Sequence, residues 1–300
     1  MLFLDLCVSS AERRQEVPFK MWEGRKLLIA AFIFTALSCK VTSVKPLDMA
    51  PDGVDGPYVG CRKEAMEKII HSGLLRQELN ASEGFQKAWS ANVQCPKLIP
   101  GGTKEHTAAL LTYANGDEDF KKNFNDAVKT FGGNASTYEN HFHFKSLHFL
   151  LMDSMFLQNP NKCQTVYILQ EHYTAKKGLK VTFGKFTEVH SDYNSLKKME
   201  DFDGQVLLNI TSCIFVNLGV DICRKEQDMT LISPTEVFTV EEVKNIYDDI
   251  NDSRYTEFIL KHSEQDRMQH CYFFSRSPAD VSPQWLVFVL VASSLITFHY

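Results

Sequence analysis

The sequence predicts an α+β fold, with an N-terminal helical half packed on a mostly antiparallel β-sheet half. Two observations carry this prediction. From about Arg62 to Gln158 apolar residues recur at helical spacing, and after Asn159-Pro160-Asn161 they alternate with a period of two. Helices that precede strands along the chain are typical of an α+β fold, whereas alternating helices and strands would indicate a parallel sheet.

The helical half contains several predicted segments. Ala65, Ile69 and Leu74 lie at helical spacing, and the same pattern continues over 105–113 and 119–131, where Gly132-Gly133 closes the helix. Ser136-Thr-Tyr-Glu139 has the form of a capping box, which predicts the start of one long helix running towards Phe156.

The second half is predicted to be a run of short strands. Their expected ranges are 164–169, 180–187, 205–213, 229–232, 236–240, 255–260 and 271–274. Pro234 cannot donate a hydrogen bond to a sheet, so it marks the end of the strand before it.

The two ends of the chain are predicted to be processing signals. Residues 1–43 are interpreted as a leader whose secretory signal peptide starts at Met21, with small Ala36 and Ser38 spaced as at a cleavage site. Residues 44–275 are the expected ectodomain. Residues 276–300 are interpreted as the propeptide of a GPI anchor attached at Ser275, with Ser277, Ala279 or a short tail-anchor helix as alternatives.

Cysteines and sequons agree with export. Six cysteines follow the leader, and six cysteines allow fifteen pairings that spacing alone does not choose between. Four Asn-x-Ser/Thr sequons, at Asn80, Asn134, Asn209 and Asn251, predict glycosylation of an exported chain. The sequence has no Cys-x-x-Cys, and its net charge of −5 comes without a basic stripe, so we expect neither a metal nor a nucleic-acid partner.

Common catalytic and metal-binding patterns are missing from the sequence. His141, His143 and His148 do not follow the four-residue spacing of a helical metal site, so we interpret them as surface or partly buried side chains. The sequence has no glycine-rich phosphate loop after a strand and no Gly-x-Ser-x-Gly elbow.

Several short motifs occur in a common order along the chain. They are Asp55-Gly-Pro-Tyr-Val-Gly-Cys61, Phe142-His-Phe-Lys-Ser-Leu-His-Phe-Leu150, Phe183-Gly-Lys-Phe186, Thr211-Ser-Cys213, Thr230-Leu231-Ile232-Ser233-Pro234 and His270-Cys-Tyr. In this order, and between both terminal signals, they resemble the vertebrate GPI-anchored ecto-mono-ADP-ribosyltransferases, the NAD(P)+–protein-arginine transferases. The resemblance implies disulfides Cys61–Cys271 and Cys163–Cys213, and it leaves Cys95 and Cys223 unassigned.

The resemblance also implies a chemistry. Such enzymes move ADP-ribose from NAD to a protein arginine at the cell surface, through an oxocarbenium-like sugar that a carboxylate stabilises. The family uses an arginine on the first strand of the β half to hold the dinucleotide and a serine to brace the site. A Glu-x-Glu pair supplies the catalytic carboxylate and a second one that orients the acceptor guanidinium.

This chain departs from the family pattern at each of these positions. Ile168 stands in place of the arginine, Glu188 in place of the serine and Met229 in place of the catalytic glutamate, while Gln227 replaces the first glutamate. We therefore predict that Ile168, Glu188 and Met229 converge on one cleft without an arginine, and that transferase activity is weak or lost. A bulge that turns Glu226 and Asp228 into substitutes is one alternative. A non-catalytic cell-surface recognition protein on the same fold is another.

Overall fold

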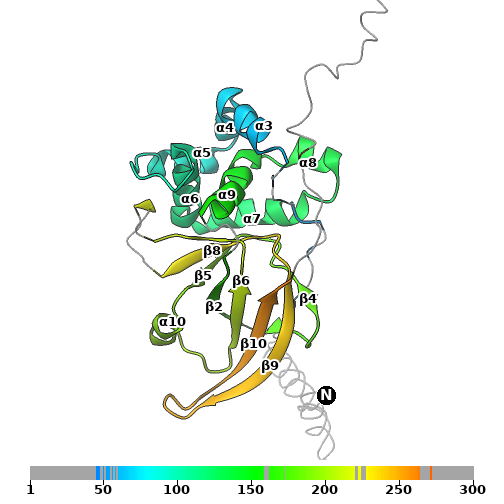
Figure 1. The fold of residues 1–300 in the computed structure, drawn as a ribbon, viewed down its shortest axis with the longest axis vertical. Helices are drawn as coiled ribbons and strands as arrows, with labels where there is room; N and C mark the ends of the chain where they lie inside the picture. Colours follow the sequence, from blue (N-terminus) through cyan, green and yellow to red (C-terminus); the bar gives the residue numbers. More distant parts are fainter. Residues whose placement is uncertain are drawn as a thin grey trace, which may run out of the picture. The chain divides into compact units, whose positions relative to one another are not determined.

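Most helices precede most strands along the chain, as the sequence predicts, with a short strand at Lys45–Pro46 and a helix at Tyr193–Met199 as the exceptions (Figure 1). The structure, a computed structural model, describes residues 45–47, 50, 52–54, 56, 58, 60–158, 162–171, 173–219, 222–223, 228–263 and 271. The predicted leader, the predicted tail with Ser275, and Glu226 all lie outside these residues. No helix within the described ranges has the length and apolar character that crossing a membrane requires.

The helical part begins at Arg62. Its elements are α3 (Arg62–Met66), the π-helical turn η1 (Glu67–His71), α4 (Leu74–Ala81), α5 (Glu83–Asn92), α6 (Lys104–Asn115), α7 (Glu118–Thr130), α8 (Ala135–His141) and α9 (Lys145–Gln158). The residues just before α5, α7 and α8 cap these helices with their own side chains, because Ser82, Asp117 and Asn134 each accept a hydrogen bond from the first turn that follows. Helix α7 ends just before Gly132-Gly133, where the sequence predicts its end.

The prediction of one long helix from Ser136 is wrong. Asn134 rather than Ser136 caps α8, and the chain leaves helical geometry at Phe142, which has φ −83° and ψ 101°. Phe142 is fully buried, so the break turns its ring into the core. Helix α9 then starts anew, because the carboxylate of Glu78 accepts the main-chain N–H groups of Lys145 (2.9 Å) and Ser146 (2.8 Å).

The strands form one mixed sheet and a small parallel pair. Their bounds are β1 (Lys45–Pro46), β2 (Gln164–Gln170), β3 (Tyr173–Thr174), β4 (Lys180–Val181), β5 (Thr187–His190), β6 (Val206–Ser212), β7 (Phe215–Asn217), β8 (Met229–Ile232), β9 (Phe238–Asp248) and β10 (Ser253–His262). The eight-stranded sheet has the order β4-β9-β10-β6-β2-β5-β8-β7 and is antiparallel except between β10 and β6. Strands β1 and β3 pair in parallel.

Several strand predictions need correction. The expected strand 180–187 is split into β4 and β5 by a turn in which Gly184 has a φ of +61°, a conformation that favours glycine. The expected strand at 271–274 is not supported at Cys271, which lies in a turn, and the rest of that range is outside the described residues. The sequence also did not predict β7 or the helix α10 (Tyr193–Met199).

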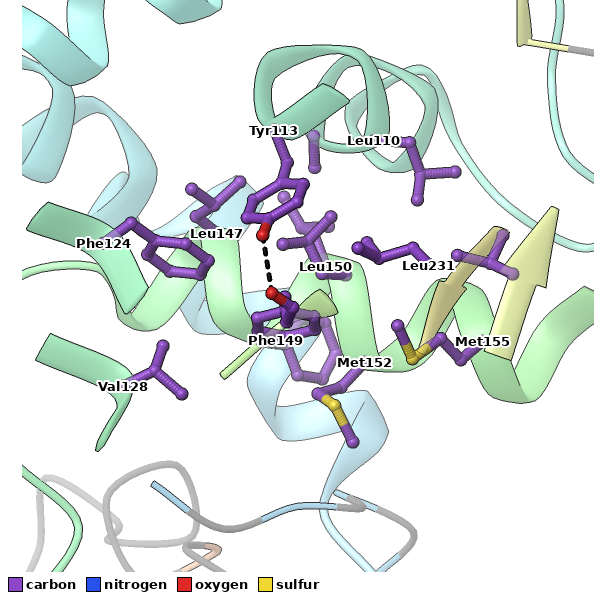
Figure 2. Packing of buried hydrophobic residues seen from close by; sticks show 14 of the residues in the cluster. Leu110, Tyr113, Phe124, Val128, Leu147, Phe149, Leu150, Met152, Met155 and Leu231 are labelled. Carbon is purple, nitrogen blue, oxygen red and sulfur yellow. Dashed lines mark hydrogen bonds between the residues drawn. The ribbon is translucent and has the colours of Figure 1, made fainter. Parts of the chain in front are cut away.

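Alternation along β5, β8 and β7 gives this part of the sheet two buried faces. Leu231 and Val216 belong to the core that the helices form, whereas Val189, Ile232 and Phe215 belong to the core between the strands. Figure 2 shows Leu231 near Met155 of α9, in the cluster that also contains Leu150 and Met152. This packing holds α6, α7 and α9 against the strands on which the family's site would lie.

Three disulfides connect distant parts of the chain. Cys61 is bonded to Cys271 and Cys163 to Cys213, which are the pairs that the resemblance implies. A third bond joins Cys95 to Cys223, the two cysteines that the resemblance leaves unassigned. This bond ties the segment after α5 to the segment before β8.

Candidate functional site

A cleft of 380 Å³ lies where α6 and α7 meet β2 and β5. Ile168 and Glu188, two of the three residues predicted to form the site, lie on its wall. The described residues that line it are Tyr113, Glu118, Lys121, Lys122, Asn125, Asp126, Ile168, Lys185, Phe186, Thr187 and Glu188. These lining residues include no arginine, and their three lysines are matched by three acidic side chains.

Ile168 gives the cleft an apolar wall. It lies on β2 opposite Leu208 of β6, and its side chain packs against the core between the strands. An isoleucine side chain has no hydrogen-bond donor, so this position cannot hold a phosphate group.

Glu188 is held by an ion pair with a helix. Its Oε1 lies 2.8 Å from the Nζ of Lys121 on α7, and only 21% of the Glu188 side chain and 18% of the Lys121 side chain are exposed. The Lys121 ammonium also lies 5.7 Å from the centre of the Tyr113 ring, within cation–π range. The half-buried cation of the cleft is therefore already occupied by a carboxylate of the chain itself.

The backbone just before Glu188 is fixed by the side-chain amide of Asn125, which hydrogen-bonds to it as a neighbouring strand would. Asn125 of α7 accepts the main-chain N–H of Phe186 at 3.0 Å and donates to its carbonyl oxygen at 3.3 Å. The Tyr113 hydroxyl donates to the same carbonyl at 2.7 Å, the bond drawn in Figure 2. Burial raises the pKa of Tyr113 well above its usual range, so the hydroxyl stays protonated and keeps donating.

Met229 lies next to this cleft but does not line it. It is the first residue of β8 and pairs with His190 of β5, whereas Glu188 pairs with Leu231. Residues two apart on a strand share a face, so Glu188, His190, Met229 and Leu231 all lie on the helix-facing side of these strands. Met229 packs against the helical core and offers a thioether there in place of a carboxylate.

Asp228 is held by hydrogen bonds to Ser195 and Ser191. Its Oδ2 accepts a hydrogen bond from the Ser195 hydroxyl of α10 at 3.0 Å, and its carbonyl oxygen accepts the N–H of Ser191 at 2.8 Å. Asp228 is not among the residues that line the cleft. The bulged substitute proposed from the sequence therefore has no support at Asp228.

The predicted histidine positions are spread over different environments. The interpretation as surface or partly buried side chains agrees with His141 and His143, which are exposed. It is wrong for His148, which is fully buried and shares a hydrogen bond of 2.8 Å with the Tyr58 hydroxyl. Among the described residues, the only group with metal-ligand spacing is Cys213, Glu236 and His262. The sulfur of Cys213 is bonded to Cys163, and Glu236 accepts the Cys213 N–H at 2.6 Å, so this group serves the fold.

The four sequons differ in accessibility. Asn80, Asn134 and Asn251 are exposed. Asn209 is half-buried on β6, and its amide already donates to Glu257 at 2.9 Å. A glycan at Asn209 would be attached to the nitrogen that makes this hydrogen bond, whereas one at Asn134 would leave the capping oxygen free to accept the Thr137 N–H.

Sequence reasoning missed Lys121 and Asn125, which complete the cleft. Both are polar side chains on an amphipathic helix, and helix α7 carries several others that simply face solvent. Only the register of α7 against β5 distinguishes them, and no short motif in the sequence encodes that register.

The amino-acid sequence of this chain is similar to those of known proteins. A family model described as NAD:arginine ADP-ribosyltransferase matches residues 47–256. Ecto-ADP-ribosyltransferase 5 of Mus musculus is 29% identical over 218 residues, which cover 67% of this chain and 69% of that protein. The GPI-linked NAD(P)(+)--arginine ADP-ribosyltransferase 1 of the same organism is 29% identical over 265 residues, which cover 80% and 77%.

Solved structures show the same fold. A mutant of the eukaryotic mono-ADP-ribosyltransferase ART2.2 in complex with NAD superposes with a TM-score of 0.56 at 26% identity, over 74% of this chain and 96% of that one. A second ART2.2 mutant, in complex with NADH, matches with the same TM-score. With its fold, its disulfides and the extent of the family match, the chain belongs to the NAD:arginine ADP-ribosyltransferase family.

Proposed function

We propose that this chain is a cell-surface member of the family in which transfer of ADP-ribose from NAD to protein arginine is weak or lost. One observation carries the proposal. The family's serine position holds Glu188, which is paired with Lys121 at 2.8 Å in a cleft whose family arginine position holds Ile168. The groups that would bind a dinucleotide are thus absent or neutralised.

The catalytic step lacks its carboxylate. As the nicotinamide leaves, positive charge develops on the ribose, and a nearby anion lowers the energy of that transition state. Met229 has no charge to offer, and Asp228 is turned towards Ser195. Losing one such electrostatic group typically costs about a hundredfold in rate or more.

NAD is the expected family substrate, and a protein arginine is the expected acceptor. The NAD complex of the ART2.2 mutant supports the first, and the names of the arginine-specific relatives support the second. The cleft of this chain opposes the negatively charged diphosphate of NAD with Glu188. The same observation favours a recognition role on the retained fold over a transferase.

The location is proposed from the relatives and the sequence together. Matching proteins are named ecto- and GPI-linked transferases, and this chain carries a predicted signal peptide and a predicted attachment residue, Ser275. Release of the protein from intact cells by a phosphatidylinositol-specific phospholipase would support a GPI anchor. Retention on the cells after that treatment would reject it.

The activity is tested by labelling. The full chain, expressed in animal cells and purified, is incubated with an arginine-rich acceptor protein and NAD labelled in its ADP-ribose. We expect no label above a sample without the protein, and none from Met229→Glu alone, since Ile168 and Glu188 remain. Activity should require Ile168→Arg, Glu188→Ser and Met229→Glu together. Labelling of arginine by the natural sequence would overturn the proposal.

A further inference from the structure

Lys121 differs from the other lysines of the cleft in its enclosure. Only 18% of its side chain is exposed, compared with 73% for Lys122, and Lys185 is also exposed. An ammonium removed from water interacts more strongly with an anion than a surface ammonium does. Lys121 is therefore the cation of this cleft that an anionic ligand would use.

The carboxylate of Glu188 already pairs with the ammonium group of Lys121. Main-chain pairing of β5 with β8 fixes the backbone of Glu188 opposite Leu231, and the Asn125 clamp on Phe186 fixes the start of the same strand. The carboxylate is thus tethered beside Lys121, as if it were a ligand present at a high local concentration. A soluble anion must displace it before it can reach the ammonium.

We propose that Lys121 is a latent anion-binding group that is closed by Glu188, and that neutralising Glu188 opens it to diphosphate-bearing ligands. The inference rests on the proposed function, because it assigns part of the loss of dinucleotide binding to one ion pair, beside the missing arginine at Ile168. It also extends that function, because it predicts that the cleft still contains a usable cation.

The energetics favour the closed state in the natural sequence. A diphosphate that took Lys121 would leave the carboxylate of Glu188 half-buried, without its cation and facing another negative charge. Glu188→Gln removes both penalties and keeps the size of the side chain. A charge-assisted hydrogen bond gained in this way corresponds to an affinity increase of about tenfold or more.

The exposed pair Lys122–Asp126 provides a matched control. Its atoms are 2.7 Å apart and its side chains are 73% and 64% exposed, on the same helix and the same cleft. Asp126→Asn changes the net charge by the same amount as Glu188→Gln. Because water and salt screen exposed ion pairs, Asp126→Asn should increase the affinity of the cleft for diphosphate only slightly.

The experiment is a calorimetric titration of inorganic diphosphate into the purified full chain, at about 0.15 M salt. We expect Glu188→Gln to bind at least about tenfold more tightly than the natural sequence, and Glu188→Gln/Lys121→Met to lose that gain. Asp126→Asn should change the affinity by less than about threefold. Glu188→Ser is the second variant, used if thermal unfolding shows that Glu188→Gln is not folded.

Three results would overturn the latent site. They are an unchanged affinity in both folded Glu188 variants, a gain that persists without Lys121, or an equal gain from Asp126→Asn. None of them bears on catalysis, because diphosphate is not a substrate. Arginine labelling by the natural sequence would instead overturn the proposed function, so the two failures are distinguishable.

Discussion

Glu78 makes the stability of the helical half depend on pH. This residue is only 6% exposed, and its carboxylate accepts the N–H groups of Lys145 and Ser146 at the start of α9. Burial raises the pKa of Glu78 to about 7, although the hydrogen bonds and the charge of Lys145 oppose the rise. The folded protein thus binds a proton at Glu78 more tightly than the unfolded chain does.

The sign and size of the effect follow from this shift. Below pH 4.5, the ordinary pKa of the group, both states are protonated and the stabilising contribution is complete. Between pH 4.5 and about 7, Glu78 is already ionised in the unfolded chain but still protonated in the folded protein. As the pH rises through about 7, Glu78 of the folded protein also ionises and the stabilising contribution is lost. The free energy of unfolding should therefore fall by about 3 kcal/mol over this range through Glu78 alone.

Urea unfolding of the oxidised protein at a series of pH values between 4.5 and 8 measures this. The difference in unfolding free energy between the natural sequence and Glu78→Gln should change by about 3 kcal/mol across the series, with the natural sequence relatively more stable at low pH. The exposed Glu83, in the first turn of α5, provides the control variant Glu83→Gln, which removes one carboxylate and leaves the buried contacts of Glu78 in place. A difference for Glu78→Gln that does not vary with pH would show that Glu78 has the same pKa in the folded and unfolded chains.

Two further predictions concern buried contacts. Asp153 accepts hydrogen bonds from the fully buried His106 (2.9 Å) and from Arg62 (2.7 Å). Asp153→Ala should therefore lower the unfolding free energy by about 3 kcal/mol. Lys122→Met, which breaks the exposed pair with Asp126, should lower it by about 0.5 kcal/mol. A loss equal to that of Lys122→Met would contradict this. A methyl group at Gly132 would come 2.0 Å from the carbonyl oxygen of Gly53, so Gly132→Ala should lower the unfolding free energy by about 3 kcal/mol or more. The control is Gly84→Ala on α5, which has open space around it and should be neutral or stabilising. Similar melting temperatures for the two alanine variants would show that the turn at Gly132 yields easily.

The class of fold could be predicted because it depends on local periodicity. Helical spacing before Asn159 and alternation after it describe the faces that become buried, and β2, β6 and β8 begin and end within one residue of expectation. The break between α8 and α9 could not be predicted in the same way. It depends on Glu78, which lies 67 residues before Lys145 in the sequence and reaches its helix start only in the folded chain.

The candidate site could also be predicted only in part from the sequence. The family motifs place Ile168 and Glu188 on strands that the fold brings to one cleft. The motifs carry no information about Lys121 or about the direction of the Asp228 side chain, because each is set by a contact with a helix, α7 in one case and α10 in the other. A substituted position can be found from sequence, but the contact that fills its place requires the structure.

The loss of dinucleotide binding is tested most directly by a calorimetric titration of NAD into the natural full chain. With Ile168 in place of the arginine and Lys121 held by Glu188, we expect no saturable binding up to about 1 mM NAD, the upper end of the usual range of KM values for enzyme substrates. Saturable binding of one NAD per chain below that concentration would contradict it, because the cleft would then hold a dinucleotide despite both substitutions.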